Sequence, residues 1–257
     1  MTEIHANKVA QVTVLFWIIK ILATTLGETG GDALSMTMNL GYAASTAIFF
    51  TVFVITVSAQ VSVRTFRPFL YWAVIVATTT AGTTMADFAD RSLGIGYVGG
   101  SLILLALLLA TLAAWRLSLG SVSVDHIATP KAELFYWATI LFSNTLGTAL
   151  GDFFADDSGL GYDGAALVFA AALTTLAAAY FFTTLSHTLL FWLAFILTRP
   201  LGATVGDWLT KPVADGGLHL GRIISSAIIA AAMVALIAVT SRHSGGGGWR
   251  GIREVQT

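Results

Sequence analysis

The chain has 257 residues, of which 56% are hydrophobic and 11% charged, and its mean hydropathy is +0.81. A soluble domain carries about 25% charged residues, so the composition excludes an ordinary soluble protein and predicts a polytopic membrane protein. The formal charge of −1 argues against a nucleic-acid partner, which requires a basic surface. The absence of cysteine excludes disulfides, thiolate metal sites and a cysteine nucleophile.

Eight apolar segments are each long enough to cross a bilayer, which takes roughly 20 residues. They lie at about 12–33, 41–63, 68–89, 96–116, 132–154, 161–186, 187–209 and 219–241. Most Lys and Arg residues fall on the amino-terminal side of this pattern, whereas the opposite links hold only Arg91 and Lys211, with Arg222 at the edge of the last span. Because positive loops stay in the cytoplasm, we expect both termini to be cytoplasmic. The polar start shows no cleavage site, so we expect no removable signal peptide.

A glycine motif that ends in aspartate recurs in every second segment. The four copies are Gly27–Asp32, Gly82–Asp87, Gly147–Asp152 and Gly202–Asp207, and each follows a tryptophan: Trp17, Trp72, Trp137 or Trp192. A Leu/Ile-Gly element then precedes the next segment, at Gly41, Gly96, Gly161 and Gly221. Self-similarity at a fixed spacing predicts tandem repeats. We expect four of them, at about 12–66, 67–121, 132–186 and 187–241, within one membrane domain over 1–257 that has a flexible tail at 242–257.

The expected fold is an all-α membrane protein with eight transmembrane helices. Two spans return the chain to its starting side, so all four motif helices run in the same direction and the repeats are parallel, unlike the inverted repeats of many transporters. This arrangement predicts pseudo-fourfold packing around a central polar site, with the four motif aspartates at a similar depth near the outer end. The tryptophans at the opposite end of these helices are expected to be anchors at the membrane surface.

Residues spaced by four share one face of a helix, and each motif helix has a small face and a polar face. The small face carries Gly27/Gly31, Gly82/Ala86, Gly147/Gly151 and Gly202/Gly206, the spacing that lets membrane helices pack closely. The adjoining polar stripe reads Lys20-Thr24-Glu28-Asp32, Thr79-Thr83-Asp87, Asn144-Thr148-Asp152 and Arg199-Ala203-Asp207. We expect these stripes to converge on one axis.

Carboxylate, hydroxyl and amide oxygens are the ligands of hard cations, and clustered carboxylates repel one another, so that some bind protons. We expect Glu28, Asp32, Asp87, Asp152 and Asp207 to be metal ligands or proton carriers. Thr79, Thr83, Asn144 and Thr148 are predicted to add oxygens, with Lys20 and Arg199 as gate or counter-charge. The first hypothesis is a transporter that exports a divalent cation, Mn²⁺ as first guess, in exchange for protons, with no resident cofactor.

Two other functions fit the same residues. One is a passive cation or proton channel, and the other is a scaffold or sensor in which Lys20 and Arg199 only neutralise the carboxylates. The aspartates also fit an interpretation without a functional site, in which they are solvated residues in the headgroup region. An enzyme is not expected, because the five histidines form no ligand pair and no phosphate-binding or dinucleotide motif is present. The oligomeric state is left open.

The repeat layout with its tryptophan, small-xxx-small-Asp motif and Leu-Gly-Tyr element resembles a family of prokaryotic integral membrane proteins of unknown function. The resemblance extends from about Val12 to Thr240 and implies the architecture and a prokaryotic cytoplasmic membrane, but no substrate. Separately, Glu28-Thr29-Gly30-Gly31-Asp32 is similar to the Glu-x-Gly-Asp signature of calcium/manganese–proton exchangers. It departs from that signature by one extra residue and occurs with Glu in one repeat only.

Overall fold

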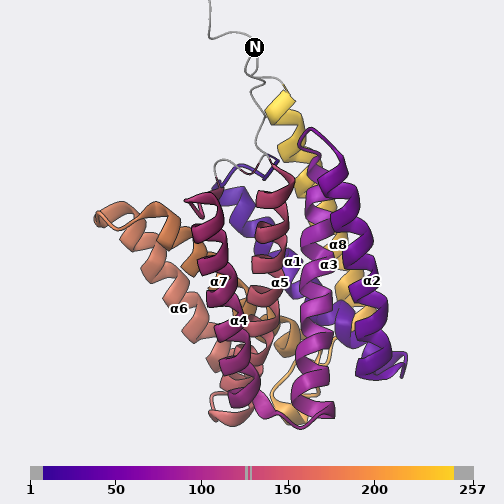
Figure 1. Cartoon of the computed structure of the whole chain (residues 1–257). Helices are drawn as coiled ribbons and strands as arrows, with labels where there is room; N and C mark the ends of the chain where they lie inside the picture. The colour runs from indigo at the N-terminus through magenta and orange to yellow at the C-terminus, as the bar shows by residue number, and fades with distance from the viewer. Residues whose placement is uncertain (1–7, 125–126, 128, 246–257) are drawn as a thin grey trace, which may run out of the picture.

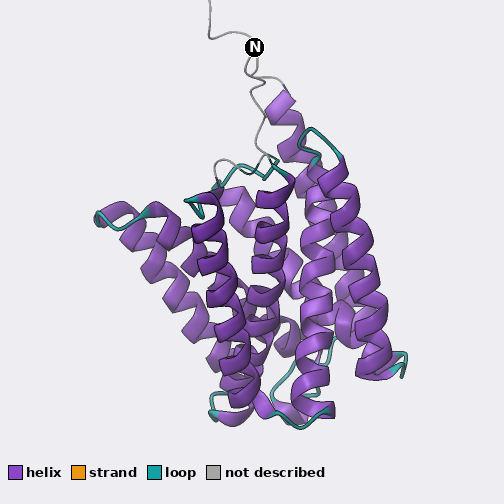
Figure 2. Ribbon diagram, viewed as in Figure 1, coloured by secondary structure: helices purple, strands orange, loops and turns teal. Residues whose placement is uncertain are grey.

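The computed structural model describes residues 8–124, 127 and 129–245, and within them the secondary structure is helical, without a strand (Figure 2). The α-helices are α1 (Val14–Asp32), α2 (Gly41–Ser62), α3 (Pro68–Asp87), α4 (Gly96–Leu119), α5 (Pro130–Asp152), α6 (Gly161–Phe182), α7 (His187–Thr210) and α8 (Arg222–Gly245). Seven of these, all except α5, are long and apolar enough to cross a membrane. α5 is as long but carries Lys131 and Glu133 in its first turn. The predicted all-α class is confirmed.

The ends of the helices differ from the expected spans in two ways. α1, α3 and α5 each continue as a turn of π-helix: η1 (Ala33–Thr37), η2 (Phe88–Ser92) and η4 (Phe153–Asp157). α8 runs to Gly245, past the expected end of the last repeat at 241, and the remainder of the predicted tail, 246–257, lies outside the described residues.

The Leu/Ile-Gly element has a backbone role. Gly41, Gly96 and Gly161 begin α2, α4 and α6 with φ values of 74°, 75° and 69°. Glycine reaches this left-handed conformation without a steric penalty, so it lets the chain turn sharply from a π-helix into the next α-helix. The fourth link uses a short 3-10 helix, η5 (Val213–Asp215), and places positive φ at Gly216 and His219 instead.

The first helices of the four repeats form a closed ring. α1 packs against α3, α3 against α5, α5 against α7, and α7 against α1. We call these the inner helices. Burial agrees with this position, since 72% of the residues in the apolar span of α3 are buried, against 11% in that of α6. The start of α1 and the C-terminal end of α8 lie at the same end of the bundle (Figure 1).

The outer helices α2, α4, α6 and α8 pack mainly on an inner helix of another repeat and only slightly, if at all, on that of their own. α2 packs on α3, α4 on α5 and α6 on α7, so that each outer helix covers the inner helix of the following repeat. α8 packs on α1 and closes the circle. The covalent repeat and the packing unit are therefore different pairs of helices.

The motif glycines set the distance between neighbouring inner helices. A β-carbon added to Gly27 would lie 2.3 Å from Thr79 Oγ1, and one added to Gly202 would lie 2.1 Å from Thr24 Oγ1. Gly82 meets Asn144, and Gly147 meets Arg199. The small faces thus hold the helices in close contact. Each polar stripe lies against the small face of the preceding inner helix, between neighbours of the ring.

Three of the four motif tryptophans are buried, which corrects the expectation that they are anchors at the membrane surface, whereas Trp17 is half-buried. Trp72, Trp137 and Trp192 are 3%, 2% and 5% exposed. Their rings join a layer of aromatic side chains in which Trp192 lies 5.8 Å from Trp115 and Trp137 lies 5.6 Å from Tyr71. The indoles fill the end of the ring opposite the aspartates, because inner helices without glycines there leave room for large side chains. We call this the aromatic end and the opposite one the acid end.

Candidate functional site

Arg199 joins all four inner helices. Its side chain is fully buried in α7, and its Nη2 lies 2.9 Å from Glu28 Oε2 on α1. The same nitrogen donates to Thr148 Oγ1 on α5 at 2.7 Å and to Thr83 Oγ1 on α3. A charge buried in a low dielectric must be paired and hydrogen-bonded. Arg199 and Glu28 satisfy this requirement through residues that the polar stripes supply, Thr83 and Thr148 among them.

The remaining polar-stripe residues form a second cluster toward the aromatic end. Lys20 is fully buried and donates to Asn144 Oδ1 at 3.3 Å, with its ammonium 4.1 Å from the centre of the Phe195 ring. Asn144 donates in turn to Thr78 at 2.9 Å. Thr79 instead donates to the carbonyl of Ala23 at 3.1 Å. In the part of the chain that the structure describes, Lys20 contacts no carboxylate.

At the acid end the four motif aspartates, each 2% exposed, divide into two pairs. Arg91 joins the first pair, with Nε 3.2 Å from Asp87 Oδ1 and Nη2 3.3 Å from Asp152 Oδ2. Lys211 joins the second pair, with Nζ 3.4 Å from both Asp32 Oδ2 and Asp207 Oδ1. Each cation bridges the aspartate of its own repeat and that of the next repeat around the ring.

Two further contacts distinguish the pairs. Arg222 Nε lies 3.3 Å from Asp32 Oδ2, whereas Tyr97, at the corresponding place of repeat two, donates to Asp156 Oδ2 at 3.1 Å. Glu28 occurs in the first repeat only and lies near the pair held by Lys211. The site therefore has two unlike halves, although it is built from four similar motifs.

Sequence reasoning missed Arg91, Lys211 and Arg222 as partners of the aspartates. Arg91 and Lys211 each stand four residues after a motif aspartate. Residues at this spacing are neighbours on a helix and form ion pairs, so the signal was present. The corresponding residues of the other repeats, Met36 and Asp156, offer no cation. This alternation accounts for the pairing of the aspartates.

Three buried carboxylates come together in a possible cation site. One oxygen each from Glu28, Asp32 and Asp207 can be chosen so that all lie within 4.8 Å of one another. Oxygens that share a divalent ion at 2.0–2.6 Å lie roughly 3–4 Å apart, so a small closing movement would fit the donor set to such an ion. Glu28, Asp32 and Asp207 are the residues that could hold a metal, and we call them the acid cluster.

Lys211 directly follows α7, and its ammonium group contacts two of these carboxylates, those of Asp32 and Asp207. Burial alone lowers the pKa of Lys211, but Asp207 and Asp32 outweigh burial and raise this pKa above its ordinary value. The link that follows Lys211 is held to the end of α7 by two backbone hydrogen bonds. The N–H of Leu218 donates to the carbonyl of Trp208 at 2.7 Å, and the N–H of His219 donates to the carbonyl of Lys211 at 3.0 Å. Lys211 therefore stays charged at neutral pH and is held over the acid cluster.

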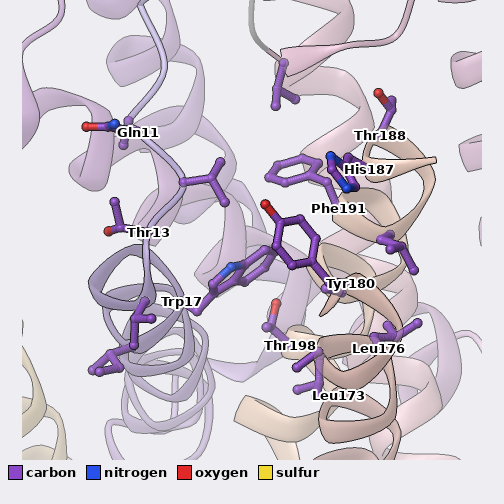
Figure 3. Close-up of a pocket in the computed structure, with 18 of the residues that line it drawn as sticks. Gln11, Thr13, Trp17, Leu173, Leu176, Tyr180, His187, Thr188, Phe191 and Thr198 are labelled. Atoms are coloured by element: carbon purple, nitrogen blue, oxygen red, sulfur yellow. The ribbon is translucent and has the colours of Figure 1, made fainter. Parts of the chain in front are cut away.

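A larger cavity lies away from these charges, between α1, α6 and α7 near the aromatic end. It has a volume of about 1090 Å³, and α6 leans away from the bundle there (Figure 1). Trp17, Tyr180 and Phe191 are among the side chains that line it (Figure 3). The described residues of its lining include no carboxylate, Lys or Arg. This mostly apolar lining suits hydrocarbon better than a cation.

The fold and the site define a class: an all-helical protein of four tandem two-helix repeats whose inner helices enclose a network of buried charges. The model of one repeat family matches the chain four times, at residues 15–66, 70–120, 135–186 and 190–245, and this family is described as a Repeat of Unknown Function (DUF347). The matches cover most of the chain, so the protein belongs to this family, and the prediction of four tandem repeats is confirmed. Comparison with curated proteins and with solved structures finds no match.

Proposed function

We propose that the protein is a membrane transporter for an inorganic divalent cation, with Mn²⁺ as the first candidate, and that it exports the ion in exchange for protons. In this proposal eight helices span a cytoplasmic membrane around a pseudo-fourfold axis, with both termini in the cytoplasm. The observation that carries it is the acid cluster: Glu28, Asp32 and Asp207 are buried, and their oxygens approach within 4.8 Å of one another.

The ion would bind at the acid cluster and the protons at the other two motif aspartates, Asp87 and Asp152. Carboxylate oxygens suit a hard cation, and a charge in the membrane interior is costly enough that such residues mark ion or proton pathways. Asp87 and Asp152 would carry protons beside Arg91, while Thr83 and Thr148 hold Arg199 as a counter-charge to Glu28. The likeness of Glu28–Asp32 to the exchanger signature rests on this short motif alone.

Flux measurements in proteoliposomes test the proposal. Purified protein should carry Mn²⁺ down its gradient with an opposite movement of protons, and Asp207→Asn and Asp32→Asn should each abolish the flux. Asp157→Asn is the matched control, because Asp157 lies exposed at the acid end. Mn²⁺ flux without proton movement would instead favour the passive channel, and normal flux in both cluster variants would refute the assignment of the site.

A second candidate function is a scaffold or sensor with a structural charge network. It is favoured by one observation: each of the five carboxylates of the polar stripes contacts a Lys or Arg, at Glu28–Arg199, Asp32–Lys211, Asp32–Arg222, Asp207–Lys211, Asp87–Arg91 and Asp152–Arg91. In this case the double variant Glu28→Arg/Arg199→Glu should retain the melting temperature of the wild type, and no divalent cation should change that temperature.

A further inference from the structure

Lys211 occupies a bridging position in the acid cluster. Its ammonium is equidistant, at 3.4 Å, from Asp32 Oδ2 and Asp207 Oδ1. Neither of these buried oxygens has a hydrogen-bond partner among the residues that the structure describes. The two oxygens therefore face a positive charge in a geometry that lacks directional hydrogen bonds, as oxygens around a metal ion also do.

A divalent ion and this ammonium would compete for the same two oxygens. Asp32 and Asp207 are two of the three members of the acid cluster, so an ion bound there would lie close to the position of Lys211 Nζ. Like charges at such a distance repel strongly where water is excluded. The two cations thus exclude each other, and binding of one requires that the other leave.

The other half of the site does not offer this exchange. Arg91 holds Asp87 and Asp152 with two different nitrogens, one of which donates a hydrogen bond to Asp152 Oδ2 at 3.3 Å. A guanidinium is a rigid planar fork, whereas a lysine ammonium is a single point charge on a flexible stem. In the half with the third carboxylate, Glu28, the cation that bridges the two aspartates is the more easily displaced one, while Arg199 holds Glu28 and Arg222 holds Asp32 from outside that bridge.

We propose that Lys211 is a built-in competitor of the substrate: its ammonium occupies the acid cluster when no ion is bound, and a divalent cation enters by displacing it. This inference rests on the proposed function and adds which half of the site binds the ion and what the ion replaces. Lys211 is the C-cap residue of α7 and directly precedes the exposed link at 212–216, so the displaced side chain has a path into solvent.

The competition is tested by the affinity of the purified full-length protein for Mn²⁺ in nanodiscs. The affinity is measured from the electron paramagnetic resonance signal of free Mn²⁺. If the cluster is free of Lys211 in about one molecule in ten, the apparent affinity is reduced tenfold by that fraction. Lys211→Met should then bind Mn²⁺ roughly tenfold more tightly than the wild type. Lys131→Met is the control, because it removes an exposed lysine at the far end of α5 from Asp152, and it should leave the affinity unchanged.

A second measurement needs no substitution. Lys211 is 7% exposed, so an amine-labelling reagent should modify it slowly in the ion-free protein and faster after Mn²⁺ is added, with the exposed Lys131 as the internal standard. Unchanged labelling on Mn²⁺ binding, or a Lys211→Met variant that binds no more tightly than the wild type, would overturn the inference while the proposed function stands. Absence of Mn²⁺ binding by both proteins would overturn the proposed function as well.

Discussion

Replacing Gly202 by alanine tests the closure of the ring between α7 and α1. The added β-carbon would lie 2.1 Å from Thr24 Oγ1 and 2.9 Å from the Thr24 carbonyl carbon. A rotation of the threonine side chain relieves only the first contact, so the two helix backbones must separate. Overpacking of this kind costs about 1–3 kcal/mol. The better helix propensity of alanine offsets roughly 1 kcal/mol of that cost.

Gly30→Ala, in the copy of the motif on α1, is the control, because a β-carbon there meets no atom within 4 Å. It should gain the propensity term alone and stabilise the protein by about 0.5–1 kcal/mol. The difference between the two variants in the free energy of unfolding, measured by denaturant titration in mixed micelles, isolates the steric cost of about 1–3 kcal/mol. Equal stabilities for the two variants would refute the close approach of α7 to α1.

Two further predictions concern the buried charges. Arg199→Met leaves Glu28 buried without its partner and should destabilise the protein by about 3–5 kcal/mol in the same titration; addition of Glu28→Gln should restore a large part of this loss, and an additive double variant would contradict the pairing. The pKa of Lys211 is raised in the folded protein. The stabilisation that the charged Lys211 gives to the folded state is therefore fully present below about pH 10.4, the pKa of lysine in the unfolded chain, and is lost at higher pH. The difference in melting temperature between wild type and Lys211→Met should therefore stay constant from about pH 7 to pH 10 and shrink above it; a decline that begins near neutral pH would contradict the raised pKa.

The sequence was sufficient to predict the helices, the four repeats and the two faces of each inner helix. These features depend on local periodicity, since residues spaced by four share a face whatever surrounds the helix. The glycines of the small face do approach the next helix closely, as Gly27 and Gly202 show. The polar stripe likewise supplies Arg199, Glu28, Thr83 and Thr148, which the structure brings together.

The sequence was insufficient where the outcome depends on which helices become neighbours. A tryptophan at a helix end is equally suited to a membrane surface and to an aromatic layer, and only the ring buries Trp72 and Trp137. The four aspartates look equivalent along the chain, but their division into pairs depends on the cation four residues later, present as Arg91 and Lys211 in alternate repeats. The packing of each outer helix on the inner helix of the following repeat could not be predicted, because the outer helices are uniformly apolar and carry no pattern that marks a partner.

The placement of α8 on α1 has a consequence for the order in which the molecule can be assembled. A chain leaves the ribosome from its N-terminus, so α1 is made first, yet two of its neighbours, α7 and α8, are made last. α2, α4 and α6 each find their inner partner as soon as the next repeat emerges. Lys20 stays without Asn144 until α5 has been made, and Glu28 stays without Arg199 until α7 has been made. Closing the circle therefore has to wait for the last two helices, and α1, the first of the eight helices to be made, is the last to gain all of its neighbours.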